Sequence, residues 1–277
     1  MVIDDAAMAA VGQALREVAQ AAILPRFRAL LPSDLTEKEG PHDLVTAADL
    51  ESEQMLAERL GRIDPGALIV GEEAAETDPA LVAQLGRPGR AWIIDPVDGT
   101  LNFACGLPLF GIIIAYTVDG VTEAGWLYDP LRDRLVTARR GHGAWIDGRQ
   151  QQIAVPRSLL AMHGILNSRN GDRRLVARMT YRANRIGSMM VLRCCAQEYM
   201  AMLDGAISFA VYHRTKPWDH AAGLLIHAEA GGFAARIDGE AYRVDWPVRP
   251  APLLVAPDRA SWEQIREALF AEEADTP

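Results

Sequence analysis

The stretch Trp92–Phe103 reads WIIDPVDGTLNF, and it carries the main signal for both fold and chemistry. An apolar run that suits a buried strand ends there at two aspartates, Asp95 and Asp98. Pro96 lies between them, and its fixed backbone φ keeps the turn stiff, so that both carboxylates can point to one side. Like charges this close repel each other. The sequence therefore predicts that a counter-charge gathers at the end of this strand.

Other acidic residues stand at the ends of predicted elements. Glu72 and Glu73 follow the apolar run Leu68–Val70, and Asp219 lies at the start of a predicted helix. Singly, such residues are most often turn formers, solvated turns or helix caps. Together, carboxylate oxygens without partnering His or Cys suit hard divalent cations such as Mg²⁺, and the Val97 carbonyl adds another oxygen. Two such ions clamp the oxygens of a phosphoryl group.

The residues after the two aspartates suit a phosphate. A helix that begins at Gly99 and Thr100 points free backbone amides at an anion. Thr100 also presents a hydroxyl beside the metals. We therefore expect Gly99 and Thr100 to contact a bound phosphate.

Composition restricts the classes of function. The chain has 277 residues, of which 49% are hydrophobic and 23% charged, and its formal net charge is −9. This acidic balance argues against binding of nucleic acid or of an anionic membrane, but bound cations still allow a small phosphorylated substrate. The three cysteines suggest neither disulfides nor a zinc site. Because the N-terminus does not read as a signal peptide and no apolar run is long enough to span a bilayer, we expect a cytoplasmic protein.

Hydrophobic spacing divides the chain into two parts. In residues 1–152 we expect helices and an antiparallel sheet, because turn signals such as Asp119-Gly120 join successive strand-like runs. In residues 153–277 apolar runs alternate with helical stretches, one of them over Met189–Leu203. The polar segment Leu31–Asp43 is rich in turn formers and is expected to form an exposed loop.

Several motifs carry a resemblance to a known family. They are GEE at Gly71–Glu73, DPVDGTLNF at Asp95–Phe103 and WDHAAGLLIHAEAGG at Trp218–Gly232, with DLVTAADL at Asp43–Leu50 and GSMM at Gly187–Met190 also in the expected order. The chain resembles the inositol monophosphatase family over most of its length. The resemblance implies an α/β (α+β) fold, an α-β-α-β-α layered sandwich of the sugar-phosphatase type. It also implies a Mg²⁺-dependent, lithium-sensitive phosphatase that forms a homodimer.

The resemblance further assigns roles to residues. A first Mg²⁺ would be held by Glu72, Asp95 and the Val97 carbonyl. A second would be held by Asp95, Asp98 and Asp219, with a third left open. The pair that orients the attacking water matches Thr100 and Asp49, and Glu72 counts with them as catalytic. Lys38 matches a lysine of a mobile loop, and Glu73 is expected to support the ligands. Residues 1–152 would carry most metal ligands, and residues 153–277 would supply Asp219 and the substrate pocket.

The substrate side matches less well. Inositol-specific members carry a glutamate seven residues before the aspartate of the Trp-Asp motif, where this chain has Tyr212 followed by the basic stretch His213–Lys216. This stretch is either a solvated loop or a place where Arg214 or Lys216 meets a second anionic group of the substrate. Tyr212, Gly187 and Ser188 are expected to contact the substrate as well.

Taken together, the residues and the resemblance predict Mg²⁺-dependent hydrolysis of a small phosphate monoester by in-line attack of a metal-activated water. Inositol 1-phosphate or a related sugar or polyol phosphate is the first substrate to test. The alternatives within the class are 3′-phosphoadenosine 5′-phosphate, fructose 1,6-bisphosphate and histidinol phosphate. A rival from another class is a catalytically silent relative that binds a metal or a partner.

Overall fold

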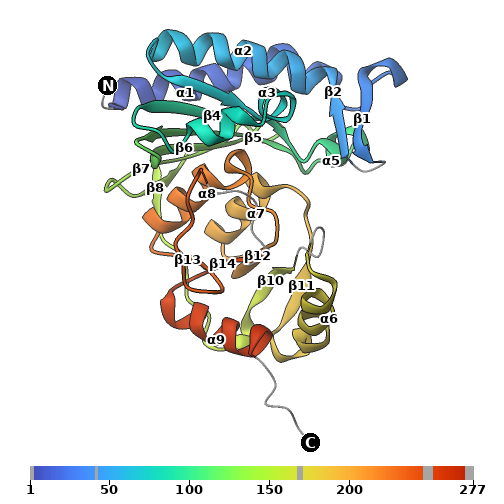
Figure 1. Cartoon of the computed structure of the whole chain (residues 1–277), viewed down its shortest axis with the longest axis vertical. Helices are drawn as coiled ribbons and strands as arrows, with labels where there is room; N and C mark the ends of the chain where they lie inside the picture. The colour runs from blue at the N-terminus through green and yellow to red at the C-terminus, as the bar shows by residue number, and fades with distance from the viewer. Residues whose placement is uncertain (1–2, 41–42, 167–170, 246–251, 272–277) are drawn as a thin grey trace, which may run out of the picture.

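The computed structural model describes residues 3–40, 43–166, 171–245 and 252–271. Helices and sheets stack in the order α-β-α-β-α, which is the layered fold that the sequence predicts (Figure 1). One outer layer holds α1 (Asp5–Val18) and α2 (Ala47–Ile63). The middle layer holds α7 (Cys195–Leu203) and α8 (Pro217–Glu229). The other outer layer holds α6 (Arg173–Arg182) and α9 (Arg259–Phe270).

The sheet next to α1 and α2 has seven strands in sequence order. They are β3 (Leu68–Gly71), β4 (Arg90–Asp98), β5 (Gly111–Val118), β6 (Val121–Asp129), β7 (Arg134–Arg139), β8 (Ala144–Ile146) and β9 (Arg149–Gln151). From β4 to β9 every pair is antiparallel, as predicted, whereas β3 lies parallel to β4. The two-residue turn Asp119-Gly120 has φ of 51° and 77°, the left-handed geometry that tight hairpins require.

The second sheet is mixed. Its order is β11-β10-β12-β14-β13, with β10 parallel to both β11 and β12 and the remaining pairs antiparallel. The strands are β10 (His163–Leu166), β11 (Ser188–Met190), β12 (Phe209–Tyr212), β13 (Phe233–Arg236) and β14 (Leu253–Ala256). Parallel pairing places the carboxyl ends of β10, β11 and β12 on the same side.

Strand β4 is apolar from Ala91 to Ile94, where both of its faces are buried. Trp92 and Ile94 pack in the core below α1 and α2, whereas Ile93 packs in the core shared with α7 and α8. Successive side chains alternate between faces. Asp95 is therefore expected on the same face as Ile93, toward α8.

Two sequence predictions about elements are wrong. The segment Leu31–Asp43 is largely ordered structure: Leu35–Gly40 forms β1, which pairs with β2 (Asp43–Thr46) as an antiparallel hairpin. Met189–Leu203 is not one helix, because Ser188–Met190 is the edge strand β11 and α7 begins only at Cys195. Both strands depend on pairing with a neighbour, which the spacing of apolar residues does not reveal.

Three short helices complete the part that precedes β5: α3 (Glu72–Thr77), α4 (Ala80–Gln84) and α5 (Thr100–Ala104). None of the helices in the described ranges combines the length and the apolar character needed to cross a membrane.

Candidate active site

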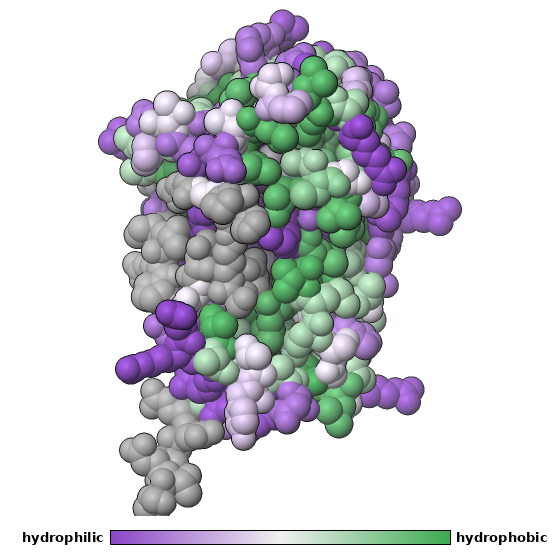
Figure 2. Space-filling model, turned by 90° about the vertical axis from the view of Figure 1, so that its right-hand side faces the viewer, coloured by the Kyte–Doolittle hydropathy of each residue, from purple (hydrophilic) through white to green (hydrophobic). Residues whose placement is uncertain are grey.

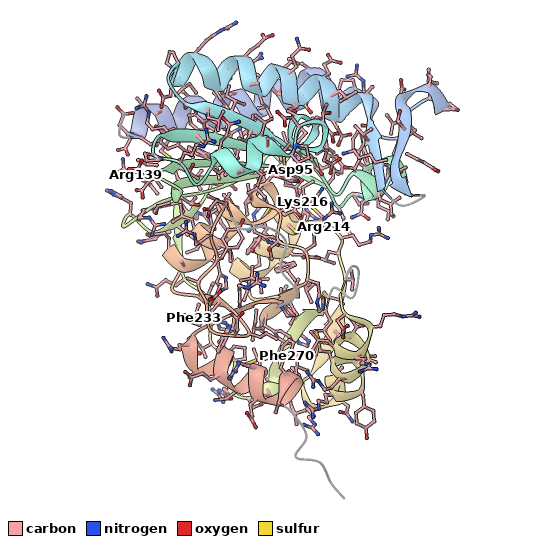
Figure 3. All side chains as sticks on the ribbon, viewed as in Figure 1. Asp95, Arg139, Arg214, Lys216, Phe233 and Phe270 are labelled. Atoms are coloured by element: carbon pink, nitrogen blue, oxygen red, sulfur yellow. The ribbon has the colours of Figure 1, made fainter. Side chains whose placement is uncertain are left out.

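Two neighbouring strands deliver three carboxylates to one place. Gly71 at the end of β3 pairs with Ile94 in β4, so Glu72 follows β3 just where Asp95 continues β4. The ladder to β5 is irregular between Asp95 and Asp98, which releases this segment from regular pairing. Figure 3 shows Asp95 at the junction between the seven-stranded sheet and the middle helices.

Asp219 joins these carboxylates from the first turn of α8. The pKa of Asp95 reflects this proximity. Burial is the largest cause that raises this pKa well above its usual value, and the nearby charges of Glu72, Asp98 and Asp219 raise it further. Burial and Asp219 likewise raise the pKa of Asp98 to about 7. The structure thus brings together the acidic residues that the sequence singled out.

The donor set fits a hard divalent cation. Burial raises the pKa of Glu72 to about 8, against the opposing charge of Lys216. Such a group of carboxylates ionises together only when positive charge compensates it. Asp95 Oδ1 is buried, and it accepts no hydrogen bond from any residue that the structure describes. An acceptor without a donor, in a set of oxygen ligands, is what a bound cation would satisfy.

Thr100 and Asp49 meet beside this cluster. Asp49 lies in the first turn of α2, where its Oδ2 accepts hydrogen bonds from the amide and the hydroxyl of Thr46. Its Oδ1 is 3.1 Å from Thr100 Oγ1, which is also 3.1 Å from the Val97 carbonyl oxygen. Burial raises the pKa of Asp49 to about 6, despite the hydrogen bonds from Thr46. The carboxylate of this pair therefore gains or loses its proton close to neutral pH.

Gly99 is needed for its conformation and for its small size. Its φ is 86°, in the left-handed region, and it precedes the first residue of α5. A Cβ at this position would lie 2.8 Å from the Leu109 carbonyl oxygen. The turn that carries Asp98 into α5 therefore excludes larger residues.

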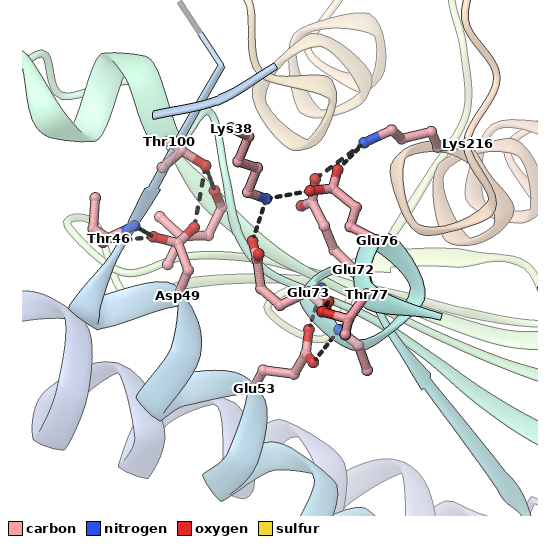
Figure 4. A network of polar contacts seen from close by, with 12 residues as sticks. Lys38, Thr46, Asp49, Glu53, Glu72, Glu73, Glu76, Thr77, Thr100 and Lys216 are labelled. Atoms are coloured by element: carbon pink, nitrogen blue, oxygen red, sulfur yellow. Dashed lines mark hydrogen bonds and ion pairs between the residues drawn. The ribbon is translucent and has the colours of Figure 1, made fainter. Parts of the chain in front are cut away.

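A network of lysines and glutamates closes one side of the site (Figure 4). Lys38 Nζ in β1 lies 2.7 Å from Glu73 and 2.6 Å from Glu76. Lys216 Nζ lies 2.5 Å from Glu76 and 3.4 Å from Glu72. Glu76 thus bridges the β1–β2 hairpin and the segment before α8. Sequence reasoning missed it, although its position one helical turn after Glu72 places both on one face of α3.

Two predicted substrate residues lie elsewhere. Ser188 is the first residue of β11, and its Oγ is 2.6 Å from His163 Nδ1, at the first residue of β10. The acidic residues lie beyond the opposite, carboxyl ends of these strands, because β12 continues from Tyr212 toward Asp219. The structure therefore does not bring Gly187 and Ser188 to the carboxylates.

The segment Leu192–Ala196 takes that place instead, and sequence reasoning missed it. Asp98 Oδ2 accepts hydrogen bonds from the Ala196 amide and, at 3.2 Å, from the Cys194 thiol. Asn102 donates to the Leu192 carbonyl oxygen at 2.8 Å. In the sequence, this segment stood out through the pair of adjacent cysteines, Cys194 and Cys195, within a predicted helix. That pair did not indicate a contact with Asp98.

Tyr212 and Arg214 differ in exposure. Tyr212 is buried, 2% exposed, with its ring centroid 4.5 Å from that of His220 and its hydroxyl beside the Glu198 carboxylate. Arg214 is partly exposed, and it lies two residues before Lys216 in the segment that leads into α8 (Figure 3). Of the two, Arg214 has the freer side chain for an incoming anion.

A layered α/β fold with buried carboxylates at strand ends and a threonine–aspartate pair defines a class of metal-assisted phosphate-processing proteins. The chain matches the model of the inositol monophosphatase family over residues 4–273. It is 32% identical to a Thermotoga maritima "fructose-1,6-bisphosphatase/inositol-1-monophosphatase" over 208 residues, 75% of this chain and 77% of that protein. A Bacillus subtilis "inositol-1-monophosphatase" is 31% identical over 211 residues, 74% and 77% of the two chains.

Solved structures agree. A Thermotoga maritima inositol monophosphatase superposes with a TM-score of 0.79 at 26% identity, covering 95% of this chain and 96% of that one. The chain therefore belongs to the inositol monophosphatase family, a family of phosphoric monoester hydrolases that generally use divalent metal ions.

Proposed function

We propose that this protein hydrolyses a small phosphate monoester with the help of two Mg²⁺ ions, and that inositol 1-phosphate is its first candidate substrate. The observation that carries the proposal is the convergence of Glu72, Asp95, Asp98 and Asp219 around an acceptor, Asp95 Oδ1, that has no donor among the described residues. Glu72, Asp95 and the Val97 carbonyl would hold one ion. Asp95, Asp98 and Asp219 would hold the other. When bound, the ions lower the pKa of water and neutralise charge on the phosphoryl group.

The residues of the chain would orient the attacking water. Thr100 Oγ1 can accept a hydrogen bond from water while it donates its own proton toward Asp49 Oδ1, 3.1 Å away. With a pKa of about 6, Asp49 is largely ionised at neutral pH and still basic enough to draw that proton. The network around Glu76 would hold the β1–β2 hairpin, and hence Lys38, beside the site. Glu73 would support it through its ion pair with Lys38.

The substrate side favours an additional anionic or polar contact. Arg214 and Lys216 are the partly exposed basic residues of the stretch that precedes α8, and Lys216 is already paired with Glu72 and Glu76. The guanidinium of Arg214 suits phosphate or carboxylate oxygens. This supports 3′-phosphoadenosine 5′-phosphate and fructose 1,6-bisphosphate, which carry a second phosphate, as alternatives to test. Histidinol phosphate has no second anionic group and is the alternative that does not depend on Arg214. Tyr212 would act on the pocket through its contacts with Glu198 and His220.

We further propose that the protein acts in the cytoplasm as a homodimer and is inhibited by lithium, as the family resemblance implies. The three free thiols support a reducing compartment. Figure 2 shows an apolar band on the face that lies to the right in Figure 1, and apolar surface of this kind supports burial against a second copy. Met190, the last residue of edge strand β11, and Val191 after it are also exposed. Sedimentation analysis would distinguish a dimer from a monomer.

A substrate panel tests the function. Purified protein would be assayed for phosphate release from inositol 1-phosphate and the three alternatives, with Mg²⁺ and with a chelator. We expect release that needs Mg²⁺ and a preference in kcat/KM for one member. The Arg214→Ala variant should lose more activity on the doubly anionic substrates than on inositol 1-phosphate. Absence of turnover on all four, with Mg²⁺ bound, would favour the catalytically silent relative.

A further inference from the structure

A thiol, a carboxylate and an imidazole meet at the edge of the acidic site. Cys195 is the first residue of α7, and Asp219 and His220 lie in the first turn of α8. Each offers one ligand atom, and these atoms lie within 4.8 Å of one another. Because α7 and α8 pack against each other in the middle layer, regular helices position all three residues. Cys195 and Asp219 are partly exposed, so the cluster is accessible from their side.

His220 is held in the form that a metal ligand requires. Its Nε2 is 3.1 Å from the Arg214 carbonyl oxygen, and a carbonyl oxygen only accepts, so Nε2 carries the proton. Nδ1 then holds a lone pair, which receives the Tyr199 hydroxyl at 3.1 Å. A histidine oriented by a backbone carbonyl through its other nitrogen is the usual arrangement of a ligating imidazole.

The ligand types select a different metal from the one proposed for catalysis. Mg²⁺ takes oxygen ligands, whereas a set of one sulfur, one nitrogen and one oxygen suits Zn²⁺. Three protein ligands leave a fourth tetrahedral position for water. Neither Cys195 nor His220 belongs to the residues proposed to hold Mg²⁺, but Asp219 does.

We infer that Cys195, Asp219 and His220 form a Zn²⁺ site, and that Zn²⁺ bound there inhibits the enzyme by taking Asp219 away from the Mg²⁺ ligands. On binding, the Cys195 S–H bond breaks, an Sγ–Zn bond forms, and the proton passes to solvent. The hydrogen bond from Tyr199 to His220 Nδ1 is exchanged for a metal–nitrogen bond. The inhibition rests on the proposed function, whereas the binding does not.

Direct binding tests the site without reference to activity. The metal-free full chain would be titrated with Zn²⁺ by calorimetry and with Co²⁺ by absorption, and a parallel series would contain Mg²⁺, which should weaken Zn²⁺ binding by competing for Asp219. We expect one cysteine-dependent site per chain and a thiolate-to-cobalt charge-transfer band. Cys195→Ser and Cys195→Ala should remove the band and weaken Zn²⁺ binding by at least about tenfold. Cys105→Ser, which alters an exposed thiol elsewhere, is the matched control and should bind as the wild type does.

Activity assays then test the consequence. Zn²⁺ should inhibit Mg²⁺-dependent phosphate release by the wild type and the Cys105→Ser variant. It should inhibit the Cys195 variants far less, when each variant is compared with its own rate in the absence of Zn²⁺. Thermal unfolding would verify that all variants are folded, and two different replacements guard against a local defect of one. Equal Zn²⁺ binding by wild type and both Cys195 variants would overturn the site. Cysteine-dependent binding in a protein without phosphatase activity would uphold the site and refute the proposed function.

Discussion

Replacement of Asp49 by asparagine is expected to remove most activity while the fold remains intact. The Asp49 carboxylate accepts hydrogen bonds from Thr46 on one oxygen and from Thr100 on the other. An amide keeps one oxygen for Thr46 and turns an N–H toward Thr100. The Thr100 hydroxyl can then donate to the Val97 carbonyl oxygen, which is already 3.1 Å away. Each polar group keeps a partner, so the substitution creates no unsatisfied buried group.

The magnitude follows from the burial of the carboxylate. Folding moves the pKa of Asp49 from 3.8 to about 6, a difference worth about 3 kcal/mol. An acid whose pKa is raised on folding binds protons more readily in the native state, so its contribution is present below about pH 4 and is lost as pH rises to about 6. In metal-free buffer, Asp49 should therefore account for a loss of up to about 3 kcal/mol in the free energy of unfolding of the wild type across this range. The Asp49→Asn variant should lack this part of the loss. Both proteins share the losses that the other buried carboxylates cause, so the difference between the two is the quantity to measure.

The same substitution should lower kcat, although it should not lower the stability of the protein at neutral pH. An amide cannot draw a proton through Thr100, and loss of a general base typically lowers kcat by about 10²–10⁴-fold. Denaturant unfolding from pH 4 to 8 and kcat with saturating Mg²⁺ measure the two effects separately. Thr100→Ser, which keeps the hydroxyl, should retain substantial activity, whereas Thr100→Val should resemble Asp49→Asn. An Asp49→Asn variant with wild-type kcat would refute the proton role, and one markedly less stable at pH 7 would refute the hydrogen-bond reasoning.

Three further substitutions probe how the site is held. Glu76→Gln replaces a carboxylate that bridges two lysines, and it should lower the free energy of unfolding by about 1–2 kcal/mol. It should also speed proteolysis within residues 35–46. Unchanged cleavage would show that the hairpin does not depend on the Glu76 carboxylate. Arg90 lowers the pKa of Asp64 to about 2, so Asp64→Asn should lower the free energy of unfolding by about 2 kcal/mol at pH 7. The difference in stability between the variant and the wild type should shrink as pH falls from 4 toward 2. A difference that does not change with pH would contradict the ion pair. Gly223→Ala would place a Cβ 2.2 Å from the Tyr199 ring, and it should lower the free energy of unfolding, measured by thermal unfolding, by about 1–3 kcal/mol. An unchanged stability would mean that the ring moves freely.

Much of the acidic centre could be predicted from sequence because its parts are local. An apolar strand that ends in Asp95 and Asp98 places both carboxylates by chain connectivity alone, and Gly99 marks the turn that follows. Parallel pairing of β3 with β4 brings in Glu72, and this is the arrangement that two apolar runs ending in acids favour. These features need no knowledge of distant contacts.

The substrate side could not be predicted in the same way because it depends on topology. Ser188 falls at the wrong end of β11 only because β11 lies parallel to β10, and no local pattern encodes that pairing. The contact of Cys194 with Asp98 joins residues far apart in the chain. Strand β1 (Leu35–Gly40) is polar and forms a two-stranded sheet with β2, so it lacks the apolar alternation that identifies a half-buried strand.

The most direct test of the central claim compares wild type with Asp95→Asn. Mg²⁺ binding would be measured by calorimetry and phosphate release from inositol 1-phosphate by a colorimetric assay, with the fold checked by circular dichroism. Because Asp95 is the buried carboxylate that is proposed to bridge both ions, the variant should remain folded, bind Mg²⁺ much more weakly and show no measurable turnover. A folded Asp95→Asn variant that releases phosphate at a near-normal rate would contradict the two-metal account.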